Sequence, residues 1–205
     1  MLITVSGVAG SGKTTAAKHI VALLHARGVV ARLHRFQSLP CFTLLSSGKS
    51  GRANPGAANE SGPAALRWAG YRRRPLTPAR SLVYLMRIVA FRLYRLTWGR
   101  HECQVMNRYF YDWFSHYELT SDRERRLFRL LSRLIPRPDI AILVTAPVPV
   151  LASRRPAYSS EYLATVSQGY DRAQTLWPHL VTIETADTDR ATPAIAKVVR
   201  QRLDG

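Results

Sequence analysis

The sequence is poor in acidic residues and cysteine, and it contains no long uncharged apolar run. Its 205 residues include 13 Asp and Glu against 30 Lys and Arg, which gives a formal net charge of +17. The two cysteines, Cys41 and Cys103, are too few for a disulfide framework and lack metal-ligand spacing, which favours a reducing compartment. The most apolar stretch, 81–98, is interrupted by three arginines, so no membrane span is expected.

The positive charge is carried mainly by arginine, since only Lys13, Lys18, Lys49 and Lys197 are lysines. The planar guanidinium grips phosphates and carboxylates at two points, so anionic small molecules, nucleic acid and an acidic membrane surface are all admissible partners. Charge alone does not choose among them. The chain starts without a basic leader or a cleavage pattern, from which we expect a cytoplasmic protein.

The remaining composition favours one compact α/β domain over residues 1–205. Hydrophobic residues make up 46% of the chain, enough for a sizeable core at this length. Apolar runs suited to buried strands alternate with stretches of helical periodicity. Strands are expected over 2–6, 29–36, 102–107, 139–145 and 180–184, and helices over 14–27, 77–98, 121–134, 147–155, 160–176 and 193–203. This order predicts five mostly parallel strands connected by helices.

A segment rich in Gly, Ser, Asn and Pro, over about 38–62, interrupts the alternation. A loop of this length in a compact domain is typical of a substrate lid or a binding loop, and plain disorder explains it equally well. We expect a mobile loop here, on the side of the domain where contacts to an acceptor would fall.

The strongest motif is a glycine-rich segment over 7–14 that fits G-x-x-x-x-G-K-[ST]. Its glycines let backbone N–H groups turn inward around phosphate oxygens, while the lysine reaches the outer phosphates and the threonine hydroxyl can ligate Mg²⁺. An expected strand precedes the motif and an expected helix follows it, as this chemistry requires. The residues expected to bind ATP are Gly7, Ala9, Gly10, Ser11, Gly12, Lys13, Thr14 and Thr15, with Thr14 also a metal ligand.

Three further segments extend the motif into a family resemblance. They are NRYFYD over 107–112, RPDIAIL over 137–143, and Arg154 and Arg155 followed by Glu161. With the glycine-rich loop they resemble the thymidylate kinase-like branch of the P-loop nucleoside monophosphate kinases. The resemblance covers nearly the whole chain except the segment 38–62. It implies a three-layer P-loop fold with strand order 2-3-1-4-5, a lid over about 153–160, and Mg²⁺-dependent transfer of the γ-phosphoryl group of ATP.

The resemblance assigns roles near the third strand, where this chain also departs from the family. Arg108 keeps the cation that would hold the acceptor or stabilise the transferring phosphoryl group. Asn107 stands where the family has an aspartate, so a carboxylate that would orient Mg²⁺ is missing. Asp112 is the nearest replacement and the second candidate metal ligand, and an exposed carboxylate at a helix start is the alternative interpretation.

The lid and the glycine-rich loop carry two further implications. Arg154 and Arg155 are the candidate catalytic arginines of the lid, or they are cations that interact with the end of a helix. Thymidylate kinases hold the acceptor sugar with a carboxylate where this chain has Ala9, and they have a glutamate where it has Ser6. Both differences argue against thymidine monophosphate as the acceptor.

Four residues are expected to contact the acceptor: Arg35, Arg87, Arg108 and Tyr109. Arg35 ends the second strand, at the edge of a parallel sheet where ligands bind, and a surface arginine is the alternative. Arg87 lies within an apolar helix, where it either faces the acceptor or reaches solvent along its aliphatic stem.

The pattern of the helix expected over 77–98 is compatible with three different surroundings. Aromatic residues recur every seven positions, aliphatic residues cover a neighbouring face, and arginines punctuate the rest. Such a helix lies in the core, forms the face of a homodimer, or rests on an acidic membrane surface. The arginine run 72–74 lacks the interleaved aromatic residues of single-strand binders, so no dedicated nucleic-acid partner is expected.

Together these observations predict an ATP- and Mg²⁺-dependent kinase of a small acceptor. A nucleoside monophosphate other than thymidine monophosphate is the first expectation. A sugar, a lipid-linked molecule or a natural product is the second. The third is a nucleotide-gated switch on an anionic partner, in which Asn107 marks lost catalysis.

Overall fold

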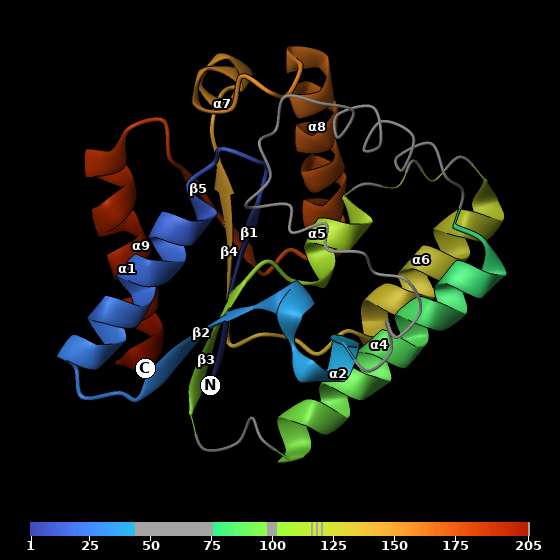
Figure 1. Ribbon diagram of the computed structural model, residues 1–205, viewed down its shortest axis with the longest axis horizontal. Helices are drawn as coiled ribbons and strands as arrows, with labels where there is room; N and C mark the ends of the chain where they lie inside the picture. Colours follow the sequence, from blue (N-terminus) through green and yellow to red (C-terminus); the bar gives the residue numbers. More distant parts are fainter. Residues whose placement is uncertain (44–75, 98–101, 116, 118, 120, 205) are drawn as a thin grey trace.

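Five parallel strands form the centre of the domain (Figure 1). The computed structural model describes residues 1–43, 76–97, 102–115, 117, 119 and 121–204. The strands are β1 (Leu2–Gly7), β2 (Ala31–Arg35), β3 (Cys103–Asn107), β4 (Ile140–Thr145) and β5 (Leu180–Glu184). They pair in the order β2-β3-β1-β4-β5, with every pair of this sheet parallel, which confirms the predicted fold class and strand order. The prediction that a mobile loop begins at about residue 38 is wrong, because residues 40–43 form a short helix and Leu39 and Phe42 are buried; residues 44–62 lie outside the described residues.

The burial of each strand follows from its place in the sheet. All residues of β1 and all but the last of β4 are buried, which matches their continuous apolar sequence. The edge strands β2 and β5 are only partly covered and carry charged residues such as Arg32 and Glu184. Because the strands are parallel, their carboxyl ends meet at one edge of the sheet, which is where ligands bind in this architecture.

Helices cover both faces of the sheet and complete three layers (Figure 1). One face is covered by α1 (Lys13–Ala26) and α9 (Thr188–Leu203). The other is covered by α4 (Pro78–Thr97), α5 (Phe110–Phe114), α6 (Asp122–Leu134) and α8 (Ser160–Leu176). Shorter helices lie near the carboxyl ends of the strands: η1 (Phe36–Ser38), α2 (Pro40–Thr43) and α7 (Val148–Arg154).

Each expected helix except the last begins within one residue of its expected start. The Ser121 hydroxyl accepts a hydrogen bond from Glu124 N, and the Ser159 hydroxyl accepts one from Tyr162 N. The predicted start of the last helix at Pro193 is wrong. Asp187 caps α9 instead, and Pro193 lies inside the helix.

The helix α4 turns its aromatic residues inward. Tyr84 and Phe91 are buried in the main core, whereas the aliphatic face is exposed, including Leu82, Val89 and Leu93. The core role predicted for the aromatic face is therefore confirmed. No described helix has the length and apolar character needed to cross a membrane.

Candidate functional site

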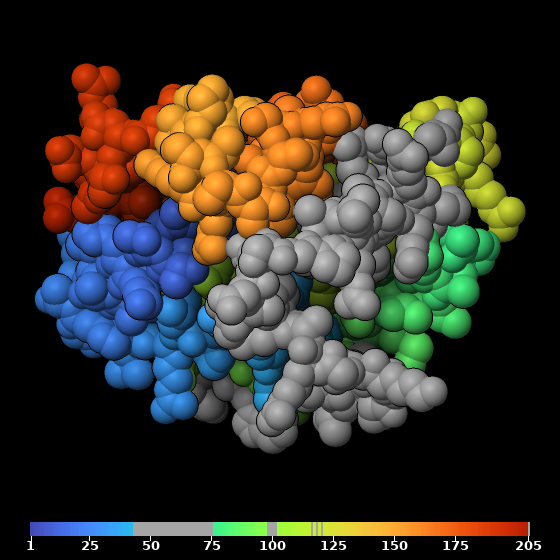
Figure 2. Space-filling view, turned by 45° about the horizontal axis from the view of Figure 1, so that its top comes forward, coloured from blue at the N-terminus to red at the C-terminus, as the bar shows by residue number. Residues whose placement is uncertain are grey.

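A cavity of about 400 Å³ opens at the carboxyl edge of the sheet, between the glycine-rich loop, the end of β2, the end of β3 and the segment after α7. In Figure 2 the orange atoms of α7 and α8 lie directly against the blue atoms of the amino-terminal part of the chain. The cavity gathers most of the predicted site residues. They are Ala9, Gly10, Gly12, Lys13, Thr14, Thr15, Arg35, Arg108, Arg154 and Arg155.

The glycine-rich loop has the backbone that its sequence demands. Gly7 has φ 150°, and a Cβ at this position would lie 2.2 Å from the Val144 carbonyl oxygen, so no side chain fits. Gly12 has φ 83° and caps α1 in a left-handed conformation. The N–H groups of the first turn of α1 therefore face the cavity, as in an anion site at a helix start. Gly7 and Ser11 do not line the cavity but support the loop from below, since the Ser11 carbonyl accepts a hydrogen bond from Thr185 Oγ1.

Lys13 is held inside the loop. Its Nζ donates a hydrogen bond to the Val8 carbonyl oxygen at 2.7 Å, and the side chain is nearly completely buried. Burial lowers the pKa of Lys13 from 10.5 to about 7, and the charges of Arg108 and Arg155 act in the same direction, with Asp112 opposing them. The unliganded site therefore has an excess of positive charge, which a phosphate ligand would relieve.

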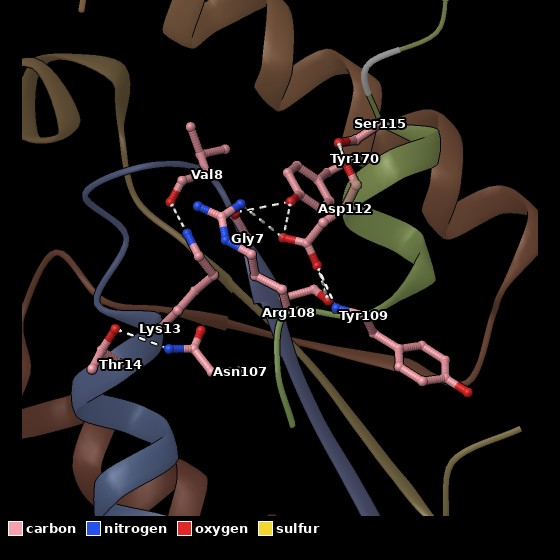
Figure 3. Close-up of polar contacts among 11 residues, drawn as sticks. Gly7, Val8, Lys13, Thr14, Asn107, Arg108, Tyr109, Asp112, Ser115 and Tyr170 are labelled. Carbon is pink, nitrogen blue, oxygen red and sulfur yellow. Dashed lines mark hydrogen bonds and ion pairs between the residues drawn. The ribbon is translucent and has the colours of Figure 1, made fainter. Parts of the chain in front are cut away.

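Asn107 occupies the position beside the Thr14 hydroxyl. Its Nδ2 donates a hydrogen bond to Thr14 Oγ1 at 3.0 Å (Figure 3). The amide thus stands where the resemblance predicts a carboxylate for Mg²⁺. Within the described part of the chain, no three His, Cys, Asp or Glu side chains gather into a metal-binding group. A protein cage for a metal is absent there, and the donors present are a hydroxyl and an amide.

Asp112 is not the exposed carboxylate that was considered as an alternative, because it is only 1% exposed. Its Oδ2 accepts hydrogen bonds from the Ser6 hydroxyl at 2.7 Å and from the Tyr109 backbone N–H at 2.8 Å. Its Oδ1 accepts one from the Tyr170 hydroxyl at 2.7 Å and lies 3.6 Å from Arg108 NH1 (Figure 3). Both oxygens are therefore occupied by donors, so the interpretation of Asp112 as a metal ligand is corrected.

Arg108 reaches the cavity from a strained backbone position. It has φ 73°, the one positive φ outside glycine among the described residues. Its backbone N–H donates to the Val5 carbonyl at 2.9 Å, so it still continues the pairing of β1 with β3. A left-handed conformation is unfavourable for a long side chain and is typical of functional sites, where the surroundings impose it.

The two lid arginines have different surroundings. Arg154 donates hydrogen bonds to the carbonyl oxygens of Gly10, Thr185 and Ala186, at 3.4, 2.9 and 3.2 Å. These hydrogen bonds connect the end of α7 to the glycine-rich loop and to the segment after β5. Arg155 also lines the cavity, and its charge lowers the pKa of Lys13.

Two predicted acceptor contacts lie elsewhere. The Tyr109 ring is fully buried, packs against Phe36 and Phe91, and points away from Lys13 in Figure 3. Its hydroxyl donates to the Pro136 carbonyl, so the prediction that Tyr109 binds the acceptor is wrong. Arg87 does not line the cavity bounded by the described residues.

Arg87 is partly exposed and stacks on an aromatic ring. Its guanidinium carbon lies 4.8 Å from the centroid of the Trp113 ring, a cation–π contact. Its Nε is buried and has no hydrogen-bond partner among the described residues. The structure therefore contradicts the predicted acceptor contact as far as the described cavity is concerned.

A second cavity of about 270 Å³ lies on the other side of the glycine-rich loop. It shares Gly10, Gly12, Thr15 and Arg154 with the first cavity. Its outer wall is formed by α1 and α9, and the buried Nε2 of His19 in this wall has no partner among the described residues. The loop thus separates two spaces that could each hold part of a ligand.

Several residues of the site escape sequence analysis. Gln37 lines the cavity from the turn after β2, next to Ser38, the first residue of the predicted acceptor-side loop, and its position at a strand end is a signal that could have found it. Ser6 and Tyr170 reach Asp112 from β1 and α8, at sequence separations of 106 and 58 residues. No local pattern connects these residues.

Comparison with known proteins identifies the fold of this chain. The sequence matches no family model and no curated protein. The structure is similar to that of a thymidylate kinase from Candida albicans, with a TM-score of 0.59 and 15% sequence identity, over 98% of this chain and 91% of that chain. That kinase is described as having broad substrate specificity and a novel structural element. The chain therefore has a thymidylate kinase-like P-loop fold.

Proposed function

We propose that this protein is a phosphotransferase that moves the γ-phosphoryl group of ATP, bound with Mg²⁺, to a nucleoside monophosphate other than thymidine monophosphate. The observation that carries the proposal is the cavity at the carboxyl edge of the sheet. A phosphate-binding loop and four arginines line this one space, which is about 400 Å³ in volume. The thymidylate kinase-like fold supports the same class of reaction.

The charge of the cavity favours ligands that carry several phosphates. Lys13 and four arginines line it, and no Asp or Glu is among its described lining residues. Cations aimed at the place where charge develops are the main source of catalysis in phosphoryl transfer. One triphosphate on the loop together with a second, phosphorylated molecule would neutralise this set of cations.

The positions of the cations suggest a division of roles. Lys13 and the N–H groups of the glycine-rich loop hold the outer phosphates of ATP. Arg108 and Arg155 face Lys13 and stabilise the transferring phosphoryl group. Arg35 stands at the end of β2, on the side of the cavity formed by Gln37 and Ser38, and holds the phosphate of the acceptor. The second cavity leaves room for the nucleoside part of ATP.

The residues beside Lys13 fit Mg²⁺ delivered together with a triphosphate. The Thr14 hydroxyl is one oxygen ligand, and the Asn107 amide lies 3.0 Å from it and can hold a metal-bound water through its oxygen. Magnesium keeps several waters and takes phosphate oxygens as ligands, so a carboxylate cage is not required. Bound there, the metal would neutralise charge on the phosphates.

Ala9 supports the exclusion of thymidine monophosphate. It lines the cavity with only a methyl group, where thymidylate kinases have a carboxylate for the acceptor sugar. A site built to bind a hydroxyl discriminates strongly, and a site without that partner loses the discrimination. We therefore expect a preference for acceptors that do not depend on this contact.

The test is phosphoryl transfer from Mg·ATP to a panel of nucleoside monophosphates, nucleosides, sugars and polyprenols, with the mass of each product measured. The expected result is the gain of one phosphoryl group by a nucleoside monophosphate. Arg35→Ala should raise the KM for that acceptor by about tenfold or more while the KM for ATP changes little. Arg32→Ala is the matched control, because Arg32 lies on the same strand but pairs with Glu102 outside the cavity.

Other outcomes separate the remaining candidates. Transfer to a sugar, a polyprenol or another non-nucleotide would identify a different kinase on the same fold. Tight ATP binding without transfer to any acceptor would contradict the proposed reaction. It would support a nucleotide-gated switch, for which the Asn107 amide beside Thr14 is the observation in favour.

A further inference from the structure

The buried carboxylate of Asp112 lies directly behind Arg108 and touches three separate elements. Ser6 belongs to β1, Tyr109 leads into α5, and Tyr170 belongs to α8. A carboxylate that is only 1% exposed is retained in a protein when its oxygens are satisfied by donors and cations. Here the donors come from the strand that feeds the glycine-rich loop and from the helix that follows the lid.

We propose that Asp112 is a positioning residue that aims the Arg108 guanidinium into the cavity, and that Tyr170 fixes Asp112 relative to the glycine-rich loop. The inference rests on the proposed function and assigns that reaction a residue outside the cavity wall. It replaces the earlier interpretation of Asp112 as a metal ligand.

Arg108 needs such a partner because its backbone alone does not determine its direction. It sits in a left-handed conformation with φ 73°, and its side chain is 38% exposed. The Asp112 Oδ1 lies 3.6 Å from Arg108 NH1, on the buried side of the guanidinium. The carboxylate therefore restrains one end of the guanidinium, while Arg108 also lines the cavity.

Tyr170 joins this pair to the loop. Its hydroxyl lies 2.7 Å from Asp112 Oδ1 and 2.9 Å from the Gly7 carbonyl oxygen, so its one proton is shared between two acceptors (Figure 3). Burial raises the pKa of Tyr170 well above its ordinary value, so the hydroxyl remains a donor. Tyr170 thus links Asp112, and through it Arg108, to Gly7, the first glycine of the loop.

The neighbouring glycine makes this contact possible. A Cβ at Gly169 would lie 2.0 Å from the Ser115 carbonyl oxygen. Only glycine at position 169 therefore allows α8 to lie this close to the end of α5. This close approach brings the Tyr170 hydroxyl within reach of Asp112.

The experiment compares Asp112→Asn, Tyr170→Phe, Arg108→Asn and the double variant Asp112→Asn with Arg108→Asn. Asparagine tolerates the left-handed backbone at position 108 and removes the cation. Tyr111→Phe is the control, because it also deletes a tyrosine hydroxyl from the core, one that contacts His179 rather than Asp112. The measurements are kcat and KM for transfer, ATP binding by calorimetry, and thermal stability.

Asp112→Asn should lower kcat by about 100-fold, the usual effect of misplacing a catalytic group. ATP binding should not weaken, since a negative charge leaves the neighbourhood of the phosphates. Tyr170→Phe should lower kcat by about tenfold and Tyr111→Phe by less than about twofold. In the Arg108→Asn background, Asp112→Asn should lower kcat by less than about twofold further, because the residue acts through Arg108.

A purely structural role gives a different pattern. If Asp112→Asn lowers kcat equally with and without Arg108, or weakens ATP binding in proportion to kcat, Asp112 is only a helix cap and the inference is overturned. If the wild-type protein transfers no phosphoryl group, the proposed function fails separately. The inference is then decided by the NMR signal of the Arg108 Nε–H group, identified by its loss in Arg108→Asn. The signal should indicate order in the wild type and averaging in Asp112→Asn, and unchanged order would refute the positioning.

Discussion

Replacing Lys13 by methionine should stabilise the unliganded protein and eliminate phosphoryl transfer. Methionine fills a similar volume without an ammonium group, and it removes a cation that the fold buries among Arg108 and Arg155. Burial lowers the pKa of Lys13 from 10.5 to about 7, so holding this lysine opposes folding at neutral pH. The residue that makes the loop a phosphate site is therefore expected to be a source of instability.

The size of the effect follows from the pKa. A shift from 10.5 to about 7 corresponds to roughly 5 kcal/mol at about 1.4 kcal/mol per unit. The lost hydrogen bond to the Val8 carbonyl offsets about 1 kcal/mol of this. Between the two pKa values the unfolded chain binds a proton that the folded protein lacks, so wild-type stability rises with pH relative to the variant. From about pH 7.5 to about pH 9.5 the difference in unfolding free energy between the two proteins should close by about 2 to 3 kcal/mol.

The assay is urea unfolding of wild type and Lys13→Met at these two pH values, with the slope of the transition compared to detect changes in the unfolded state. All other titrating groups are common to both proteins, so their contributions cancel in the difference. Two results would refute the reasoning: a variant less stable than wild type at neutral pH, or a stability difference that does not change with pH.

Four further substitutions test separate parts of the structure. Gly169→Ala should destabilise the protein by at least about 2 kcal/mol in urea unfolding, since its Cβ would lie 2.0 Å from a backbone oxygen; stability close to wild type would contradict the packing. Ala9→Asp should raise kcat/KM for thymidine monophosphate in the transfer assay, and an absence of gain would sink the explanation of acceptor choice. Arg154→Ala should lower the free energy of unfolding by about 1 kcal/mol through loss of its backbone contacts. Arg155→Ala should lower kcat, because Arg155 lines the cavity and its charge acts on Lys13, and an unchanged kcat would contradict this role.

The parts of the fold that local sequence determines could be predicted from the sequence. The continuous apolar residues of β1 and β4, the serine caps of α6 and α8, and the glycine-rich motif each act over a few neighbouring residues. The family resemblance then supplied the strand order, which local patterns do not contain. Arg35 was placed correctly in the cavity because it ends a strand of a parallel sheet.

The wrong predictions for Tyr109 and Asp112 concern side chains whose direction the local sequence does not determine. Tyr109 and Asp112 are three residues apart at the start of α5, and either could have faced the cavity. The structure sends the Tyr109 ring into an aromatic core with Phe36 and Phe91, and Asp112 toward Tyr170. That choice is decided by residues from η1, α4 and α8, which the spacing of 107–112 does not reveal.

The end of the chain illustrates a competing local signal. Pro193 is typical of the first turn of a helix, but Asp187 upstream accepts hydrogen bonds from Asp189 N and Arg190 N and caps α9 earlier. The proline is tolerated inside the helix in this position, so the capping carboxylate prevails over the proline as a start signal.

The distribution of carboxylates explains how this site differs from the family it resembles. Acidic residues are absent at Ala9 and Asn107, and the acid near the cavity that the structure does place, Asp112, lies behind the wall with both oxygens occupied. On the proposed function, the phosphates of the ligands neutralise the cations of the described wall. Burial is the largest cause of the low pKa of Lys13, and the neighbouring Arg108 and Arg155 lower it further while Asp112 opposes them. If the proposed function holds, binding of a triphosphate raises the pKa of Lys13, because phosphate charge beside the lysine favours its protonated form.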